Sequence, residues 1–266
     1  MNTSLFPLNL KGRNALISGS TQGIGFATAQ ALAGLGATCT LIARNEDALQ
    51  KAVESMDKSE GQKHGYLVAD FSDPEHLRVV ASGFFKDHTV DILVNNTGGP
   101  AAGPITEAST DAFLAAFNQH LICNQILTTL AAAGMKTGKW GRIVNIISTS
   151  VKVPLKGLGV SNTIRAAVAS WAKTMSIELA PFGITVNNVL PGATSTGRLA
   201  AIINHKSDKT GASKDAVQDE MLEEIPAKRF GRPEEVAALA AFLCTDAAGY
   251  INGTSIPVDG GRTGSI

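Results

Sequence analysis

The chain has 266 residues, 44% of them apolar, and it carries 23 basic and 23 acidic side chains. This length suits one large α/β domain or two small ones, with ample apolar material for a core. Because the net charge is zero, the chain lacks the basic surface typical of proteins that bind nucleic acid or an anionic membrane.

The targeting and redox signals predict a cytoplasmic protein. The first residues have no basic segment followed by an apolar one, so we expect neither a signal peptide nor an anchor. No apolar run reaches the roughly 18 residues of a membrane helix. The three cysteines are far apart and odd in number, which argues against a disulfide scaffold and against a metal site. We therefore expect buried cysteines, no metal, and no membrane or nucleic-acid partner.

Short apolar runs alternate with longer amphipathic stretches. The runs are rich in Val, Ile and Leu, which is typical of strands buried on both faces of a parallel sheet: NALIS, TCTLIA, GYLVA, DILVNN, RIVNIIS and ITVNNVL. Helix start signals lie between them at Asp73-Pro74 and at Arg232-Pro233. The alternation predicts one α/β domain over residues 1–266, a doubly wound parallel sheet that binds ligands at the carboxyl ends of its strands.

A glycine-rich turn follows the first strand. Gly19 permits a tight turn, Gly23 lets the backbone approach a pyrophosphate, and Gly25 lets the next helix pack close to the sheet. Free amides at the start of that helix would face the phosphates. A strand before the turn and a helix after it indicate a dinucleotide site, and the alternative is a tight turn without a ligand.

The end of the second strand predicts which dinucleotide binds. An NAD site places an acidic residue here to hold the ribose 2′-hydroxyl, but this chain has Ala43 followed by Arg44. An arginine can instead hold a 2′-phosphate through a forked, charge-assisted contact. We therefore favour NADP(H) over NAD(H), the alternative being that Arg44 is a solvated residue before a helix.

These motifs, in this order, closely resemble the short-chain dehydrogenase/reductase family, particularly its β-ketoacyl-acyl-carrier-protein-reductase-like members. SGSTQGIG is similar to the family's TGxxxGIG, Asp70 matches the aspartate that contacts adenine, and NNTG at residues 95–98 matches NNAG with Thr97 in place of alanine. PGATST at residues 191–196 matches PGxxxT, and GRPEEV and VDGG match the C-terminal signatures. The resemblance covers nearly the whole chain and implies a Rossmann fold with about seven strands in the order 3-2-1-4-5-6-7.

The resemblance implies the residues that hold the cofactor. By motif they are Gly19, Ser20, Thr21, Gln22, Gly23, Ile24, Gly25, Arg44, Asp70, Asn96, Gly98, Arg165, Pro191, Gly192, Thr194 and Thr196.

The catalytic positions depart from the family pattern. The family uses an asparagine, a serine, and a tyrosine and lysine four residues apart on one helix. Ser148 matches the serine, but Ser161 stands thirteen residues later where the tyrosine belongs, Arg165 replaces the lysine, and His120 replaces the asparagine. Because the spacing is kept, we expect the site to be retained with altered side chains.

The alterations change the acid–base chemistry that is available. A serine hydroxyl is a far weaker acid than a tyrosine phenol, and arginine stays protonated, so it cannot relay protons as lysine does. Histidine titrates near neutrality, so His120 is a candidate proton relay through water and Ser161. The alternative is a buried histidine that fills the volume of the asparagine. Lys152 and Lys156 are other candidate donors, although they more simply belong to an exposed loop.

The resemblance also implies a substrate lid near residues 194–228 and a homo-oligomer, a tetramer or a dimer, formed through two long helices and the C-terminal strand. The leading functional hypothesis is an NADP(H)-dependent oxidoreductase that transfers hydride between nicotinamide and a small carbonyl or alcohol substrate. Two alternatives remain: a catalytically silent NADP(H)-binding protein, and a dehydratase or epimerase working in the same pocket.

Overall fold

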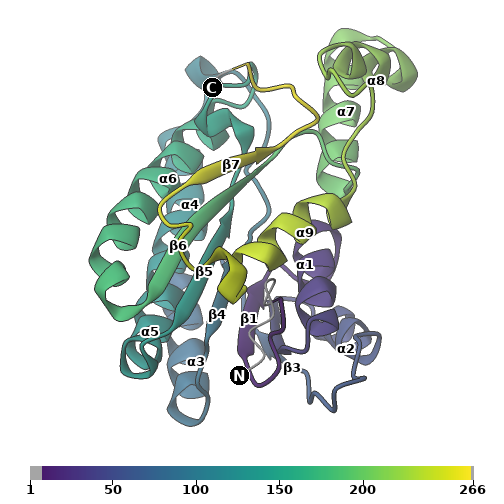
Figure 1. Ribbon diagram of the computed structural model, residues 1–266. Helices are drawn as coiled ribbons and strands as arrows, with labels where there is room; N and C mark the ends of the chain where they lie inside the picture. Colours follow the sequence, from purple (N-terminus) through teal and green to yellow (C-terminus); the bar gives the residue numbers. More distant parts are fainter. Residues whose placement is uncertain (1–7, 265–266) are drawn as a thin grey trace.

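A computed structural model describes residues 8–264 of the chain. A seven-stranded sheet in the order β3-β2-β1-β4-β5-β6-β7 forms its centre, and all of its strands pair in parallel (Figure 1). The strands are β1 (Asn14–Ser18), β2 (Thr38–Ala43), β3 (Gly65–Val68), β4 (Ile92–Asn95), β5 (Gly141–Ile146), β6 (Ile184–Pro191) and β7 (Ser255–Val258). The predicted fold class and strand order are confirmed.

Helices cover both faces of the sheet (Figure 1). Buried residues of α1, α2 and α9 pack in one apolar cluster, and those of α3, α5 and α6 pack in the other. The helices are α1 (Gly23–Gly34), α2 (Glu46–Glu54), α3 (Pro74–Asp87), α4 (Thr110–Phe117), α5 (Cys123–Gly138), α6 (Gly159–Leu179), α7 (Gly197–Thr210), α8 (Lys214–Glu223) and α9 (Pro233–Leu243). None of the helices within residues 8–264 is long and apolar enough to cross a membrane.

The apolar strand runs supply both clusters because successive side chains of a strand point to opposite faces. In β1, Ala15 and Ile17 join the first cluster while Leu16 joins the second. In β4, Ile92 and Val94 face one way and Leu93 the other. This two-sided burial explains why these strands are continuous apolar runs rather than alternating ones.

The sequence signals for helix starts and cysteine burial are confirmed. The Asp73 side chain accepts a hydrogen bond from the backbone N–H of His76 at 3.0 Å, and α3 begins at Pro74. Helix α9 begins at Pro233. All three cysteines are free and buried. The expectation that the N-terminus holds neither a signal peptide nor an anchor concerns residues that lie partly outside the described part of the chain.

A row of buried amides joins β4, β5 and β6 and reaches the first residue of β7. Asn95 Nδ2 donates to Asn145 Oδ1 at 2.9 Å, and Asn145 Nδ2 donates to Asn188 Oδ1, also at 2.9 Å. Asn188 Nδ2 then donates to the Ser255 hydroxyl at 3.0 Å. These residues are register partners in β4, β5, β6 and β7. The row of hydrogen bonds therefore stabilises the register of these four strands.

We predict that Asn145→Ala lowers the free energy of unfolding by about 2–4 kcal/mol, because it leaves a buried donor on Asn95 and a buried acceptor on Asn188 without partners. Urea denaturation followed by circular dichroism measures the change. Asn204→Ala, which removes an exposed amide on α7, is the control and should change stability by no more than about 0.5 kcal/mol. A loss below about 1 kcal/mol for Asn145→Ala would contradict the role assigned to the row.

Candidate active site

A cleft of about 1990 Å³ opens at the carboxyl ends of the strands. Its walls come from the turn before α1, the segments after β4, β5 and β6, the start of α6, and α7. The pocket of a single drug-sized molecule typically measures about 300–1,000 Å³, so this cleft has room for an extended ligand together with a second small one.

The glycine turn has the geometry of a phosphate cradle. Gly19 and Gly23 have φ values of +59° and +58°, which favour glycine. A Cβ on Gly19 would lie 2.4 Å from the Asn96 carbonyl oxygen, and a Cβ on Gly25 would lie 2.2 Å from that of Gly19. The Gln22 side chain does not cap α1, so the amides of its first turn remain available to an anion. This part of the cleft fits a pyrophosphate.

Most of the predicted cofactor residues line the cleft: Gly19, Thr21, Gln22, Gly23, Ile24, Arg44, Asp70, Asn96, Gly98, Arg165, Pro191, Gly192, Thr194 and Thr196. Two do not. Ser20 is buried and its hydroxyl donates to the Ile17 carbonyl at 2.9 Å, while Gly25 packs behind the turn. Both therefore support the turn from behind.

Arg44 and Asp70 lie at the far end of the cleft, after β2 and β3. Arg44 is exposed, as a group that meets a phosphate from solvent should be. The Asp70 carboxylate accepts from the backbone N–H of Ser72 at 2.9 Å, and this hydrogen bond holds the pKa of Asp70 below its usual range. Asp70 is therefore ionised and fixed in place at neutral pH.

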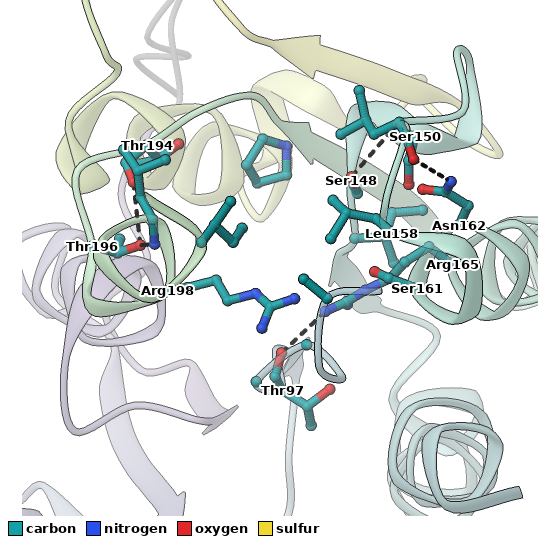
Figure 2. A pocket seen from close by; sticks show the side chains of 18 of the residues that line it. Thr97, Ser148, Ser150, Leu158, Ser161, Asn162, Arg165, Thr194, Thr196 and Arg198 are labelled. Atoms are coloured by element: carbon teal, nitrogen blue, oxygen red, sulfur yellow. Dashed lines mark hydrogen bonds between the residues drawn. The ribbon is translucent and has the colours of Figure 1, made fainter. Parts of the chain in front are cut away.

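Ser148, Ser161 and Arg165 meet on one wall of the cleft (Figure 2). Ser148 follows β5, and its Oγ accepts from the backbone N–H of Ser150 at 3.1 Å, which fixes the hydroxyl at the start of a 3₁₀ turn. Ser161 and Arg165 lie one turn apart in the first turns of α6, and each is only 8% exposed. The spacing-based expectation that these three residues share a site agrees with this geometry.

The Arg165 guanidinium spans the ends of two neighbouring strands. Nη1 donates to the Ile146 carbonyl at 3.0 Å and Nη2 donates to the Thr97 carbonyl at 3.2 Å. Burial, with a smaller effect from Arg198, lowers the pKa of Arg165 to about 10. The group therefore stays charged at neutral pH and joins the segment after β4 to the end of β5.

His120 lies behind this wall rather than in it. It is 1% exposed, it does not line the cleft, and its Nδ1 shares a hydrogen bond with the Thr97 hydroxyl. Its Nε2 is buried without a hydrogen-bond partner among the described residues. Burial first, and then the charges of Arg165 and Arg198, lower the pKa of His120 to about 2. The imidazole is thus neutral at physiological pH and cannot supply a proton as imidazolium.

The helical segment that carries His120 is not a regular α-helix throughout. A π-helical turn at Asn118–Ile122 joins α4 to α5. Such a turn contains one residue more than a turn of α-helix, and it is frequent at functional sites. The sequence carries no simple signal for it, because its residues are ordinary helix formers in an amphipathic pattern.

Sequence reasoning missed Arg198, in the first turn of α7. Its guanidinium is half-buried, lines the cleft, and donates from Nη2 to the Pro100 carbonyl at 2.6 Å. A cation in the first turn opposes the helix dipole, and α7 has no acidic residue there. That unfavourable placement, two residues after Thr196, was the available signal.

Neither of the chain's two tyrosines lines the cleft, and of the two candidate lysines only Lys156 does. The Tyr66 hydroxyl donates to Glu46 at 3.1 Å, Tyr250 is fully exposed, and neither lines the cleft. Lys152 also lies outside the cleft lining, whereas Lys156 belongs to it. No described tyrosine therefore replaces the missing phenol.

The chain is similar to known proteins over almost its entire length. A family model described as enoyl-(acyl carrier protein) reductase matches residues 19–263. The chain is 32% identical to NADPH-dependent reductase BacG of Bacillus subtilis, over 96% of this chain and 99% of that protein. It is 34% identical to a putative ketoacyl reductase of granaticin polyketide synthase from Streptomyces violaceoruber, over 93% and 92%. The structure of L-sorbose reductase from Gluconobacter frateurii, complexed with NADPH and L-sorbose, superposes with a TM-score of 0.90 at 29% identity, covering 98% and 100% of the two chains.

We predict that His120→Asn makes the protein less sensitive to acid. The pKa of His120 in the folded protein, about 2, lies below its ordinary value of 6.5, so below pH 6.5 the unfolded chain binds a proton that the folded chain does not. Folding therefore loses stability through His120 as the pH falls from 6.5. In the His120→Asn variant this loss is absent. Its free energy of unfolding should therefore rise relative to that of the parent by about 1.4 kcal/mol for each unit by which the pH falls in that range.

Urea denaturation from pH 7.5 to 4.5 measures this difference. His205→Asn, which removes an exposed imidazole on α7, is the matched control. A stability difference between His120→Asn and the parent that stays constant across this range would contradict a neutral, buried His120.

Proposed function

The chain belongs to the short-chain dehydrogenase/reductase family, and on that premise we propose that it is an NADP(H)-dependent oxidoreductase acting on a carbonyl or alcohol substrate. The observation that carries the proposal is the convergence of Ser148, Ser161 and Arg165 on the cleft that also contains the glycine turn. Family membership alone would not distinguish an enzyme from a silent nucleotide-binding protein.

The residues present fit an NADP(H) molecule. The glycine turn and the free amides of α1 suit the pyrophosphate, and Asp70 suits the adenine. Arg44, exposed at the end of β2, suits the 2′-phosphate, and no acidic residue occupies the end of β2, where an NAD site would have one. The relatives named as NADPH-dependent reductases support the same preference.

When bound, the cofactor supplies a hydride to a carbonyl carbon, and the carbonyl oxygen then gains negative charge. The hydroxyls of Ser148 and Ser161 donate hydrogen bonds to that oxygen. Fixed donors of this kind stabilise a developing oxyanion strongly in a site that excludes bulk water. The backbone N–H of Ser150 bonds to the Ser148 oxygen at 3.1 Å, which leaves the hydroxyl hydrogen free to point at the substrate.

Arg165 supplies charge rather than a proton. Its guanidinium stays ionised at neutral pH, and its two backbone contacts hold it against the wall that carries Ser161. A positive charge on the same wall as the two serine hydroxyls favours the oxyanion. The proton comes from water by way of the Ser161 hydroxyl, because neutral His120 has none to give as imidazolium and lies behind Thr97.

We assign the proposed substrate lid, residues 194–228, to helices α7 and α8. The two helices project away from the sheet (Figure 1). Several of their side chains line the cleft, among them Arg198, His205 and Met221. Helices α4 and α6 expose the apolar side chains of Leu114, Phe117 and Ile177, which supports the proposed homo-oligomer.

We predict that Ser148→Ala lowers kcat/KM for carbonyl reduction by about 100-fold, the effect of losing one oxyanion donor. The dissociation constant for NADPH, measured by fluorescence, should change less than about twofold, because Ser148 is assigned to the substrate oxygen. A carbonyl panel monitored at the NADPH absorbance gives the rates.

Ser59→Ala is the matched control, since Ser59 is an exposed serine outside the cleft. Tight NADPH binding with no turnover of any carbonyl or alcohol would instead favour the silent binding protein. Unchanged activity in Ser148→Ala would contradict the role of its hydroxyl.

We predict that Arg44→Leu weakens NADPH binding by about 10- to 100-fold, the contribution of a hydrogen bond to a charged group, and leaves NADH binding within about threefold. Fluorescence titration of both cofactors measures the two constants. Arg229→Leu, a surface arginine paired with Glu235, is the control. Equal losses for NADPH and NADH would show that Arg44 does not read the 2′-phosphate.

A further inference from the structure

We propose that Arg198 binds a carboxylate of the substrate, so that the enzyme acts on oxo acids or hydroxy acids in preference to neutral ketones and alcohols. This inference rests on the proposed function, because it assigns the substrate class of the same cleft. It concerns a residue outside the altered catalytic positions.

Arg198 is directed into the cleft from the side opposite the catalytic wall. Figure 2 shows its side chain extending from the start of α7 toward the space in front of Ser161 and Arg165. Within the described part of the chain its guanidinium makes one hydrogen bond, from Nη2 to the Pro100 carbonyl, which holds the group there. It lies near enough to Arg165 and His120 for its charge to lower the pKa of both. The group therefore faces the reacting end of the cleft rather than the glycine turn.

The acidic residues that line the cleft have other partners or lie at its other end. Glu220 forms an ion pair with Lys206 at 2.8 Å, and Glu224 forms one with Arg262. Asp70 belongs to the end occupied by Arg44. Within residues 8–264, no carboxylate lies within ion-pair distance of Arg198.

The protein thus half-buries a cation beside a second cation without supplying a neutralising charge. Burying an ionised group is costly unless it is paired, and the positive end of the α7 dipole adds to the cost. A guanidinium has five N–H donors in a planar fork that matches a carboxylate in a bidentate contact. With one donor used by Pro100, enough remain for that contact, and an anionic ligand would remove the unfavourable charge.

Two kinds of anionic group could be the ligand of Arg198 in this cleft: a carboxylate of the substrate and the phosphates of the cofactor. The glycine turn, the α1 amides and Arg44 already supply the phosphate contacts. Arg198 instead shares its surroundings with Thr97, Arg165 and His120. The geometry therefore favours the substrate carboxylate, and the experiment separates the two sources.

The test measures binding of matched acid and ester pairs to the full-length enzyme saturated with NADP⁺. The probes are pyruvate, acetoacetate and levulinate, each compared with its methyl ester. Binding is measured by calorimetry and by the shift in Tm of the enzyme. In the parent enzyme at least one acid should bind more tightly than its ester. Arg198→Met should lower the affinity for that acid by about 10- to 100-fold, as expected for a lost charged hydrogen bond, and should leave the ester unchanged.

Two further variants sharpen the outcome. Arg198→Lys, which keeps the charge but loses the fork, should recover part of the preference. Lys209→Met removes an exposed cation from the same helix and should keep the acid preference in full. An equal loss in Lys209→Met would overturn the proposal in favour of the diffuse charge of α7.

Two other results would overturn it. The first is a parent enzyme with no preference for any acid over its ester. The second is an Arg198→Met variant that binds NADPH at least about tenfold more weakly with an unchanged acid-to-ester ratio, which would assign Arg198 to the cofactor phosphates. Because the readout is binding, acid preference without turnover would contradict the oxidoreductase proposal while leaving the role of Arg198 intact.

Discussion

The catalytic wall depends on the buried guanidinium of Arg165. A charge this deeply buried is tolerated only when its donors have acceptors, and the structure supplies two backbone carbonyls, those of Ile146 and Thr97. The Ile146 carbonyl lies at the end of β5, from which the chain continues to Ser148, and the Thr97 carbonyl lies in the segment after β4. The side chain that stands in the family's lysine position therefore also sets the distance between the two strand ends that frame the reaction site.

Three of the residues that depart from the pattern implied by the family resemblance form one bonded cluster. Thr97 stands where the family has alanine, His120 where it has asparagine, and Arg165 where it has lysine. In the fold, the Thr97 hydroxyl bonds to His120 while its carbonyl accepts from Arg165. Alanine at position 97 would leave the buried Nδ1 of His120 without this partner, at a cost of about 1–3 kcal/mol. These three residues are therefore structurally coupled through Thr97.

Much of the fold and half of the site could be predicted from the sequence because they depend on local patterns. Buried strand runs, the glycine turn and the spacing from Ser148 to Ser161 to Arg165 are set by backbone geometry, which tolerates changes of side chain. His120 and Arg198 were harder, since their roles depend on neighbours far away in sequence. The sequence placed His120 at the catalytic position but not behind Thr97, and its pKa is lowered by burial and by the charges of Arg165 and Arg198, two residues distant in sequence. The place of Arg198 in the cleft depends on the position of α7, which directs its side chain there and which no local sequence pattern predicts.

The two ends of the cleft have thus followed different constraints. At the cofactor end, steric limits are severe, because a Cβ on Gly19 or Gly25 would lie within 2.4 Å of backbone atoms, and the family pattern is kept there. At the reacting end, the constraint is electrostatic: hydroxyls lie beside a permanent cation, where the family resemblance implies a phenol–ammonium pair that can exchange a proton. Such a site favours stabilising an oxyanion over donating a proton to it. Arg198 adds a second permanent cation at this end, so the chemistry performed there depends on a substrate that brings negative charge of its own.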